Sequence, residues 1–331
     1  MTYKMKNTYD KLDRYDHKII SELDINARIA ASAISRKIRL PKETVNFRVK
    51  RLLKRDYIKN FYTLINGSTC GYQYYKIFIK FNNMTKNLEE EVKDFLLAEK
   101  SCANLRISDG FFDICFVSMH KNPEDLKQFM HRFHTKFGRN ILLRSMNQII
   151  SSYKFSQKFF PQSKEIRNKI YYGRTSDYNL DEIDKKVIRI LSIQARTKLI
   201  DMSSQLNEDP KVIKYHMKKL EKDGIIIGYF TALNLEILHK SLVQIDISLK
   251  DPTKIHLILD YFQKTNAGTF ASEMLGRYDL TIEIYIDDDN QLRNIIQKFK
   301  ETFSYNIMFY DLSRIYQEFV VNWSPFDALK K

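Results

Sequence analysis

The segment Lys42–Arg55 holds side chains whose types and spacing suit the reading of duplex DNA. Val45, Val49 and Leu52 recur at helical spacing and predict one buried stripe, which leaves a polar face opposite. Asn pairs with adenine, Arg pairs with guanine, and an exposed Phe contacts a thymine methyl group, whereas lysines further along suit phosphates. We therefore predict DNA contacts from Arg36, Lys37, Lys42, Thr44, Asn46, Phe47, Arg48, Lys50, Arg51 and Lys54. Packing of Phe47 on a neighbouring domain is the alternative for that residue.

The elements that must position this helix form a familiar order. Asp13 is a plausible N-cap of a first helix, and a second helix is expected near Ala30–Ile38. The turn Arg39–Pro41 contains a proline, which disfavours helix in the residue before it and suits a first helical turn. After the basic helix, Tyr57–Leu64 is expected to be a strand that supplies a wing. This order predicts a winged helix-turn-helix.

The chain also contains a long internal repeat. Leu12–Asn66 aligns without a gap with Leu180–Asn234, at an offset of 168 residues and with 16 identities in 55 positions. Further along, the sequence from Gly110 to Asp113 corresponds to the sequence from Gly276 to Asp279. Chance agreement over so long a stretch is improbable, so the chain is a tandem duplication of one two-domain unit.

The second copy of the basic helix keeps the layout with weaker chemistry. Pro210 begins it, and its outward residues are predicted to contact DNA: Lys211, Lys214, Tyr215 and Lys218. An aromatic residue therefore recurs at the exposed position, as Phe47 and Tyr215. However, Glu208 and Asp209 lie at the turn, where phosphates would repel them. The alternative is a degenerate copy that serves as a scaffold.

The net charge is +15, and it is concentrated at the front of the chain. Residues 1–66 carry +9, residues 180–234 carry +2, and residues 235–331 carry −3. Clustered positive charge favours a polyanionic partner, with a solvated basic surface as the alternative.

After each wing the apolar pattern changes to a period of two, as in Lys76–Phe81, where alternate residues face opposite sides of a strand. Helices are then expected near Leu88–Leu97 and Pro123–Phe137. Strands are expected near Ala103–Ser108, Phe112–Met119 and Ile141–Tyr153, and the second copy has the same order. The order βαββαβ predicts a ferredoxin-like domain. Its open sheet needs cover on one face, and the second copy is the expected cover.

The predicted class is therefore α+β, with two winged helix-turn-helix domains, each followed by a ferredoxin-like βαββαβ (RAM-type) domain. The predicted boundaries are 1–66 and 180–234 for the winged helices, and 67–153 and 235–331 for the ferredoxin-like domains. Residues 154–179, which are basic and tyrosine-rich, are expected to be a linker, with auxiliary DNA contact as an alternative role.

The chain resembles the Lrp/AsnC (feast/famine) regulators over nearly its whole length, twice. The resemblance rests on the pattern LDxxDxxII from Leu12, the turn and basic helix at Leu40–Leu52, and IxxFxT at Ile58–Thr63. It rests also on a GxxD element in each ferredoxin-like domain. Family members normally carry one unit per chain, and Asp56 replaces the usual glycine after the basic helix.

The resemblance implies DNA binding by the winged helices and dimerisation by the ferredoxin-like domains. It also implies an amino-acid effector site near the GxxD loops, at Gly110, Asp113, Gly276 and Asp279. We expect an intrachain pseudo-dimer or a homodimer, double-stranded DNA as partner, and two different reading helices that favour asymmetric DNA sites, because operator symmetry mirrors protein symmetry.

Catalytic chemistry is not indicated. His131, His134, Cys102 and Cys115 could be imagined as a zinc set, but the second copy keeps none of them, so no metal and no cofactor are expected. The three cysteines form no paired framework, and no signal peptide or membrane-length apolar stretch is seen, which suits a cytoplasmic protein. Two alternatives stay open: a fused siroheme-decarboxylase-like enzyme, and an architectural protein that coats DNA with little sequence preference.

Overall fold

The computed structural model describes residues 12–155, 167–171, 178–265 and 267–320. Each copy begins with three helices and one strand. In the first copy these are α1 (Arg14–Ile25), α2 (Ala31–Ile38), α3 (Lys42–Lys54) and β1 (Ile58–Ile65); in the second they are α6 (Glu182–Ile193), α7 (Leu199–Leu206), α8 (Pro210–Lys222) and β7 (Ile226–Leu233). The expected N-cap is confirmed, because the Asp13 carboxylate accepts hydrogen bonds from the backbone of Tyr15 and Asp16.

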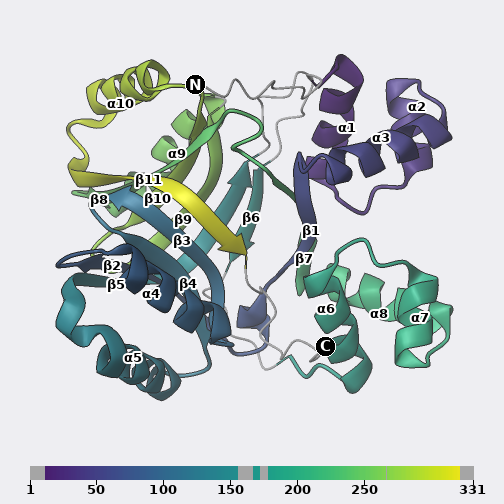
Figure 1. Ribbon diagram of the computed structural model, residues 1–331, viewed down its shortest axis with the longest axis horizontal. Helices are drawn as coiled ribbons and strands as arrows, with labels where there is room; N and C mark the ends of the chain where they lie inside the picture. The colour runs from purple at the N-terminus through teal and green to yellow at the C-terminus, as the bar shows by residue number, and fades with distance from the viewer. Residues whose placement is uncertain (1–11, 156–166, 172–177, 266, 321–331) are drawn as a thin grey trace, which may run out of the picture.

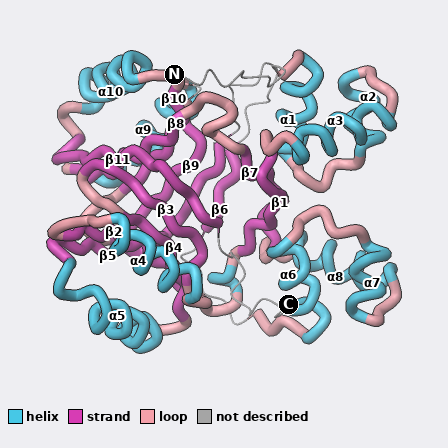
Figure 2. Tube along the Cα trace, in the orientation of Figure 1, coloured by secondary structure: helices cyan, strands magenta, loops and turns pink. Residues whose placement is uncertain are grey.

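The strand after each basic helix does not stand alone as a wing. β1 and β7 pair with each other in an antiparallel ribbon, with Phe61 opposite Thr231 and Thr63 opposite Tyr229 (Figure 2). A single strand leaves its backbone groups unpaired, and the second copy supplies the partner. One apolar core consequently runs through both winged helices. The two winged-helix units are thus one body in which the ribbon is shared.

Reciprocal hydrogen bonds lock this body. The Arg28 guanidinium donates to the carbonyl oxygens of Ala195 and Thr197, the latter at 2.9 Å, and Arg196 donates to the carbonyl of Ala27. Two hydroxyls repeat the exchange: Thr63 Oγ1 donates to Leu191 O at 2.7 Å, and Thr231 Oγ1 donates to Leu23 O at 2.9 Å. Each repeat therefore satisfies the helix end of the other.

The back halves confirm the predicted βαββαβ order. The first comprises β2 (Gln73–Phe81), α4 (Lys86–Ala98), β3 (Cys102–Gly110), β4 (Ile114–His120), α5 (Pro123–Phe137) and β5 (Ile141–Phe155). The second comprises β8 (Ser241–Leu249), α9 (Ile255–Lys264), β9 (Gly268–Leu275), β10 (Leu280–Ile286), α10 (Asp289–Phe303) and β11 (Ile307–Val320). Short 3-10 turns lie between these elements, at Gly67–Thr69, Gly138–Asn140 and Pro252–Lys254.

The two sheets close into one barrel. Their strands follow the order β2-β4-β3-β11-β8-β10-β9-β5, and β5 returns to pair with β2. The seams between the copies are β3 with β11 and β5 with β9, both antiparallel. Helices α4 and α5 cover the outside of one half, and α9 and α10 cover the other (Figure 1). The cover expected for each open sheet is therefore the sheet of the other copy.

One strand was not predicted. β6 (Arg167–Tyr171) pairs with β5 at the edge of the barrel, within the expected linker 154–179. The rest of that segment lies largely outside the described residues. Among the described residues, no helix is long and apolar enough to cross a bilayer.

Glycines hold the seams of the barrel. Gly110 has a φ of +136°, and a Cβ at this position would collide with the Leu312 carbonyl oxygen of β11. Gly276 has a φ of +157°, and its Cβ would lie 2.7 Å from the Met146 carbonyl oxygen of β5. Only a residue without a side chain permits so close an approach of two backbones.

Replacement of Gly110 by Ala tests whether the seam carries stability. Gly71 is the matched control, since its φ is also positive, at +83°, but no atom lies within 4 Å of its Cβ position. We expect Gly110→Ala to lower the urea midpoint by more than Gly71→Ala, because the first variant adds a backbone clash to the strain of a positive φ. Equal losses in the two variants would show that the seam contact is unimportant.

Candidate nucleic-acid interface

Helix α3 presents a polar face to solvent. Val45 and Leu52 are buried and Val49 is partly buried, as the predicted stripe requires. Phe47 is 65% exposed, so it does not pack on a neighbouring domain in this chain. The exposed predicted contacts are Arg36, Lys37, Lys42, Asn46, Lys50 and Lys54, while Thr44 is half-buried. Lys37 is paired with Glu22 of α1.

Two of the predicted reading residues are engaged inside the protein. Arg48 pairs with Asp13 at 2.7 Å and with Asp16 at 2.9 Å, and Arg51 pairs with Asp16 at 2.6 Å. The Asp16 side chain is only 1% exposed, and both guanidinium groups lie against it. Burial disfavours the charge of Arg48, but its bonds to Asp13 and Asp16 outweigh this and raise its pKa. Both guanidinium groups fasten α3 to α1, a role that the helical spacing alone did not reveal.

Helix α8 repeats this design with other residues. His216 Nδ1 lies 2.7 Å from Asp184 Oδ1, and Lys219 Nζ lies 2.9 Å from Asp184 Oδ2. Asp181, Asp184 and His216 therefore gather ligand-type atoms. They occupy the positions of Asp13, Asp16 and Arg48, so the cluster is explained as the same helix clamp. The sequence repeat contained this signal, which the prediction of site residues did not use.

The outer face of α8 is also open. Tyr215 is 64% exposed, nearly the same as Phe47 in the first copy, and Lys211, Lys214 and Lys218 are exposed. At the turn before α8, the Asp209 carboxylate caps the helix by accepting a hydrogen bond from the Lys211 backbone. Helices α3 and α8 lie on the side of the ribbon away from the barrel (Figure 1).

The four GxxD residues lie elsewhere, at the barrel seams. Asp113 accepts from the Phe81 backbone at 2.8 Å and pairs with Lys80 at 2.6 Å, while Asp279 accepts from the Leu249 backbone at 2.7 Å. Both carboxylates therefore tie the loop to a neighbouring strand end. The effector role of Gly110, Asp113, Gly276 and Asp279 stays a prediction from the family resemblance.

The four residues considered as a zinc set lie on different elements of the first ferredoxin-like domain. Cys102 and Cys115 are buried in β3 and β4, where burial raises their pKa values to about 12 and about 11. His131 and His134 lie on the outer helix α5.

Comparison with known proteins supports this interface. A family described as "Winged helix-turn-helix DNA-binding" matches residues 12–59 and 180–227. An HTH-type transcriptional regulator of Pyrococcus horikoshii is 32% identical over 120 residues, which is 36% of this chain and 75% of that protein. The leucine-responsive regulatory protein of Haemophilus influenzae is 28% identical over 141 residues, covering 40% of this chain and 81% of that one.

Among solved structures, a siroheme decarboxylase matches 94% of this chain and 95% of its own with a TM-score of 0.62. Its sequence identity of 11% means that the likeness concerns the fold alone. The match shows that the paired, two-copy architecture also occurs in another single chain.

The duplicated helices, the basic helix α3 and these matches define a winged-helix DNA-binding protein. The chain belongs to the Lrp/AsnC family, as a tandem-duplicated transcription regulator.

The helix clamp predicts a stability effect that is separate from DNA contact. Arg51→Ala removes one of two cations from the buried Asp16 carboxylate and should cost about 1–3 kcal/mol. Lys54→Ala, one turn away and exposed, is the matched control and should change stability by less than about 0.5 kcal/mol. Urea unfolding followed by circular dichroism measures both. An Arg51→Ala protein as stable as the control would remove the clamp from the explanation of this fold.

Proposed function

We propose that α3 enters the major groove of DNA and acts as the main reader, with α8 as a weaker second reader. The observation that carries this proposal is the row of exposed side chains on α3, which suits base edges near its start and phosphates further along. Asn46 and Phe47 are assigned to bases, and Lys42, Lys50 and Lys54 to phosphates.

The engagement of Arg48 and Arg51 refines this assignment. Both act by fixing the angle of α3 against α1, so their loss would weaken DNA binding through the fold. In α8, Lys211, Lys214 and Lys218 are assigned to phosphates, and Tyr215 takes the place of Phe47. Because the ribbon joins the two readers rigidly, they meet one DNA molecule together, and their different faces favour an asymmetric site.

DNA binding across a salt series tests the proposal. Lys50→Ala combined with Lys54→Ala should flatten the dependence of log K on log salt by about two, since each phosphate contact contributes about one. Lys214→Ala combined with Lys218→Ala should have a smaller effect, and Lys127→Ala on the outer helix α5 is a control with no expected effect. An unchanged slope in the α3 variant would refute the assignment.

Site selection from random DNA separates a specific regulator from the architectural alternative. Asn46→Ala should relax preference at one or two base pairs at a cost of about 1–3 kcal/mol each. A selected site without symmetry is the expected result. A palindrome bound by a single chain contradicts the two-reader scheme, and failure to enrich any sequence favours an architectural protein.

The enzyme alternative draws its support from the full-length fold likeness to a siroheme decarboxylase. It has a direct test, since a purified chain that takes up iron uroporphyrin develops a Soret band. Absence of that band from the chain after unbound tetrapyrrole has been removed by gel filtration would remove this alternative without affecting the DNA-binding proposal.

A further inference from the structure

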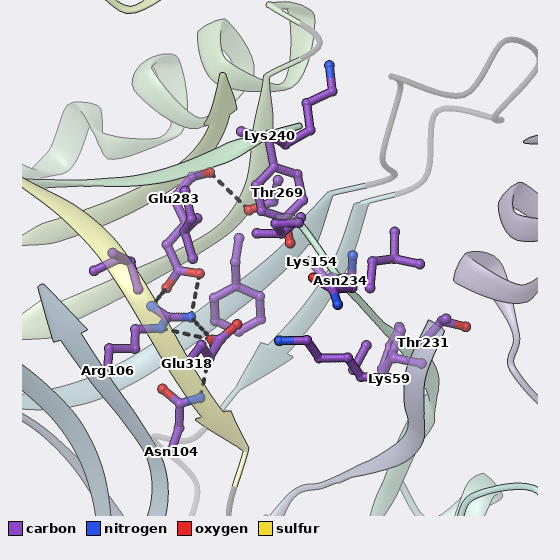
Figure 3. Close-up of a pocket in the computed structure, with 18 of the residues that line it drawn as sticks. Lys59, Asn104, Arg106, Lys154, Thr231, Asn234, Lys240, Thr269, Glu283 and Glu318 are labelled. Carbon is purple, nitrogen blue, oxygen red and sulfur yellow. Dashed lines mark hydrogen bonds and ion pairs between the residues drawn. The ribbon is translucent and has the colours of Figure 1, made fainter. Parts of the chain in front are cut away.

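A cavity of about 650 Å³ lies between the β1–β7 ribbon and the mouth of the barrel (Figure 3). Its volume is within the range of small-molecule sites, which favour domain boundaries and barrel mouths. It is separate from the exposed faces of α3 and α8. Sequence reasoning missed it, because its walls come from strands of both copies that meet only after the barrel has closed.

Aromatic rings form part of the wall. Tyr62 and Phe230 face each other across the ribbon with their ring centroids 5.9 Å apart, and Phe270, Tyr285 and Tyr316 contribute from the barrel. The hydroxyls of Thr231 and other small residues interrupt these rings. Such a wall suits a flat apolar body that also carries polar groups.

The inner end of the cavity is already neutralised. Arg106 holds Glu283 at 2.8 Å and Glu318 at 2.6 Å, and Lys76 lies 3.6 Å from Glu283. Burial opposes ionisation of Glu283, but Arg106 and Lys76 outweigh it and hold its pKa below the ordinary value. Two cations therefore balance two carboxylates, and this cluster sets a polar floor without attracting a charged ligand.

The outer part of the cavity carries lysine side chains that are less fully paired with carboxylates. Lys59 extends from β1 into the cavity and has no hydrogen bond or ion pair with another described residue (Figure 3). Lys154 of β5 also lines the cavity, and it forms a long ion pair with the buried carboxylate of Asp24 in α1, with Nζ and Oδ1 3.4 Å apart. In contrast, Lys240 and Arg314 at the rim are paired with Asp287 and Asp289. Among these four cations, Lys59 is thus the one without an ion-pair partner in the described residues, and Lys154 is the one whose ion pair is longest, so these two are the cations offered to a ligand.

We propose that this cavity binds an organic anion with a flat apolar body, its carboxylate or phosphate groups facing Lys59 and Lys154 and its body against Tyr62 and Phe230. The occupant bridges the ribbon, which carries both winged helices, and the barrel. The inference is independent of which bases α3 reads.

Two fluorescent probes that differ in a single charged group test the proposal on the full chain. Anilinonaphthalenesulfonate carries the flat body and a sulfonate, and N-phenylnaphthylamine carries the same body without it. We expect saturable binding of the anionic probe at about one per chain. Lys59→Glu should weaken the anionic probe at least tenfold and leave the neutral probe nearly unchanged.

Lys127→Glu on α5 makes the same charge change at a side chain that is 76% exposed and distant from the cavity, and should bind both probes like the parent chain. Lys154→Met gives a second variant that keeps the aliphatic stem. Equal affinities of Lys59→Glu and Lys127→Glu for the anionic probe, or no saturable binding by the parent chain, would overturn the proposal.

Competition then identifies the chemistry of the anionic group. Displacement of the probe by benzenetricarboxylate supports a carboxylate ligand, and displacement by pyridoxal phosphate supports a phosphate ligand. Failure of both competitors at millimolar concentration overturns the proposal. DNA binding measured in parallel distinguishes loss of this site from loss of the reading helices.

Discussion

The structure depends on the requirement that every strand edge find a partner. A single copy would leave β1 unpaired and its four-stranded sheet open at β3 and β5, with rows of backbone groups facing water. The second copy meets all of these needs at once, by pairing β7 with β1, β11 with β3, and β9 with β5. The winged helices and the barrel are consequently products of the same pairing, and neither is complete within one half of the chain.

Much of this could be predicted, because local patterns carry it. The N-cap at Asp13, the buried stripe through Val45 and Leu52, and the bounds of α5 follow from periodicity and capping, which act over a few residues. The sequence repeat predicted two copies of a two-domain unit, and the open ferredoxin-like sheet predicted that the second copy covers the first.

What escaped prediction depends on contacts between distant residues. The helical wheel places Arg48 and Arg51 on the flank of α3, but only the crossing of α3 with α1 brings them to Asp16. Similarly, Lys76 is an ordinary polar residue on an alternating strand until barrel closure turns its face inward and places it near Glu283. The cavity at the barrel mouth has the same origin. Chemistry that arises from assembly leaves little trace in spacing along the chain.

The reciprocal bonds of Arg28 and Arg196 have a consequence for how such a protein changes over generations. In a dimer of identical chains, every substitution appears on both sides of the symmetry axis, so a harmful change strikes twice. Here the two arginines remain matched while helices α3 and α8 differ: His216 stands at the position of Arg48, and Lys214 stands at the position of Asn46. The covalent link lets the two halves differ in sequence, and the matched bonds hold the arrangement that both halves share.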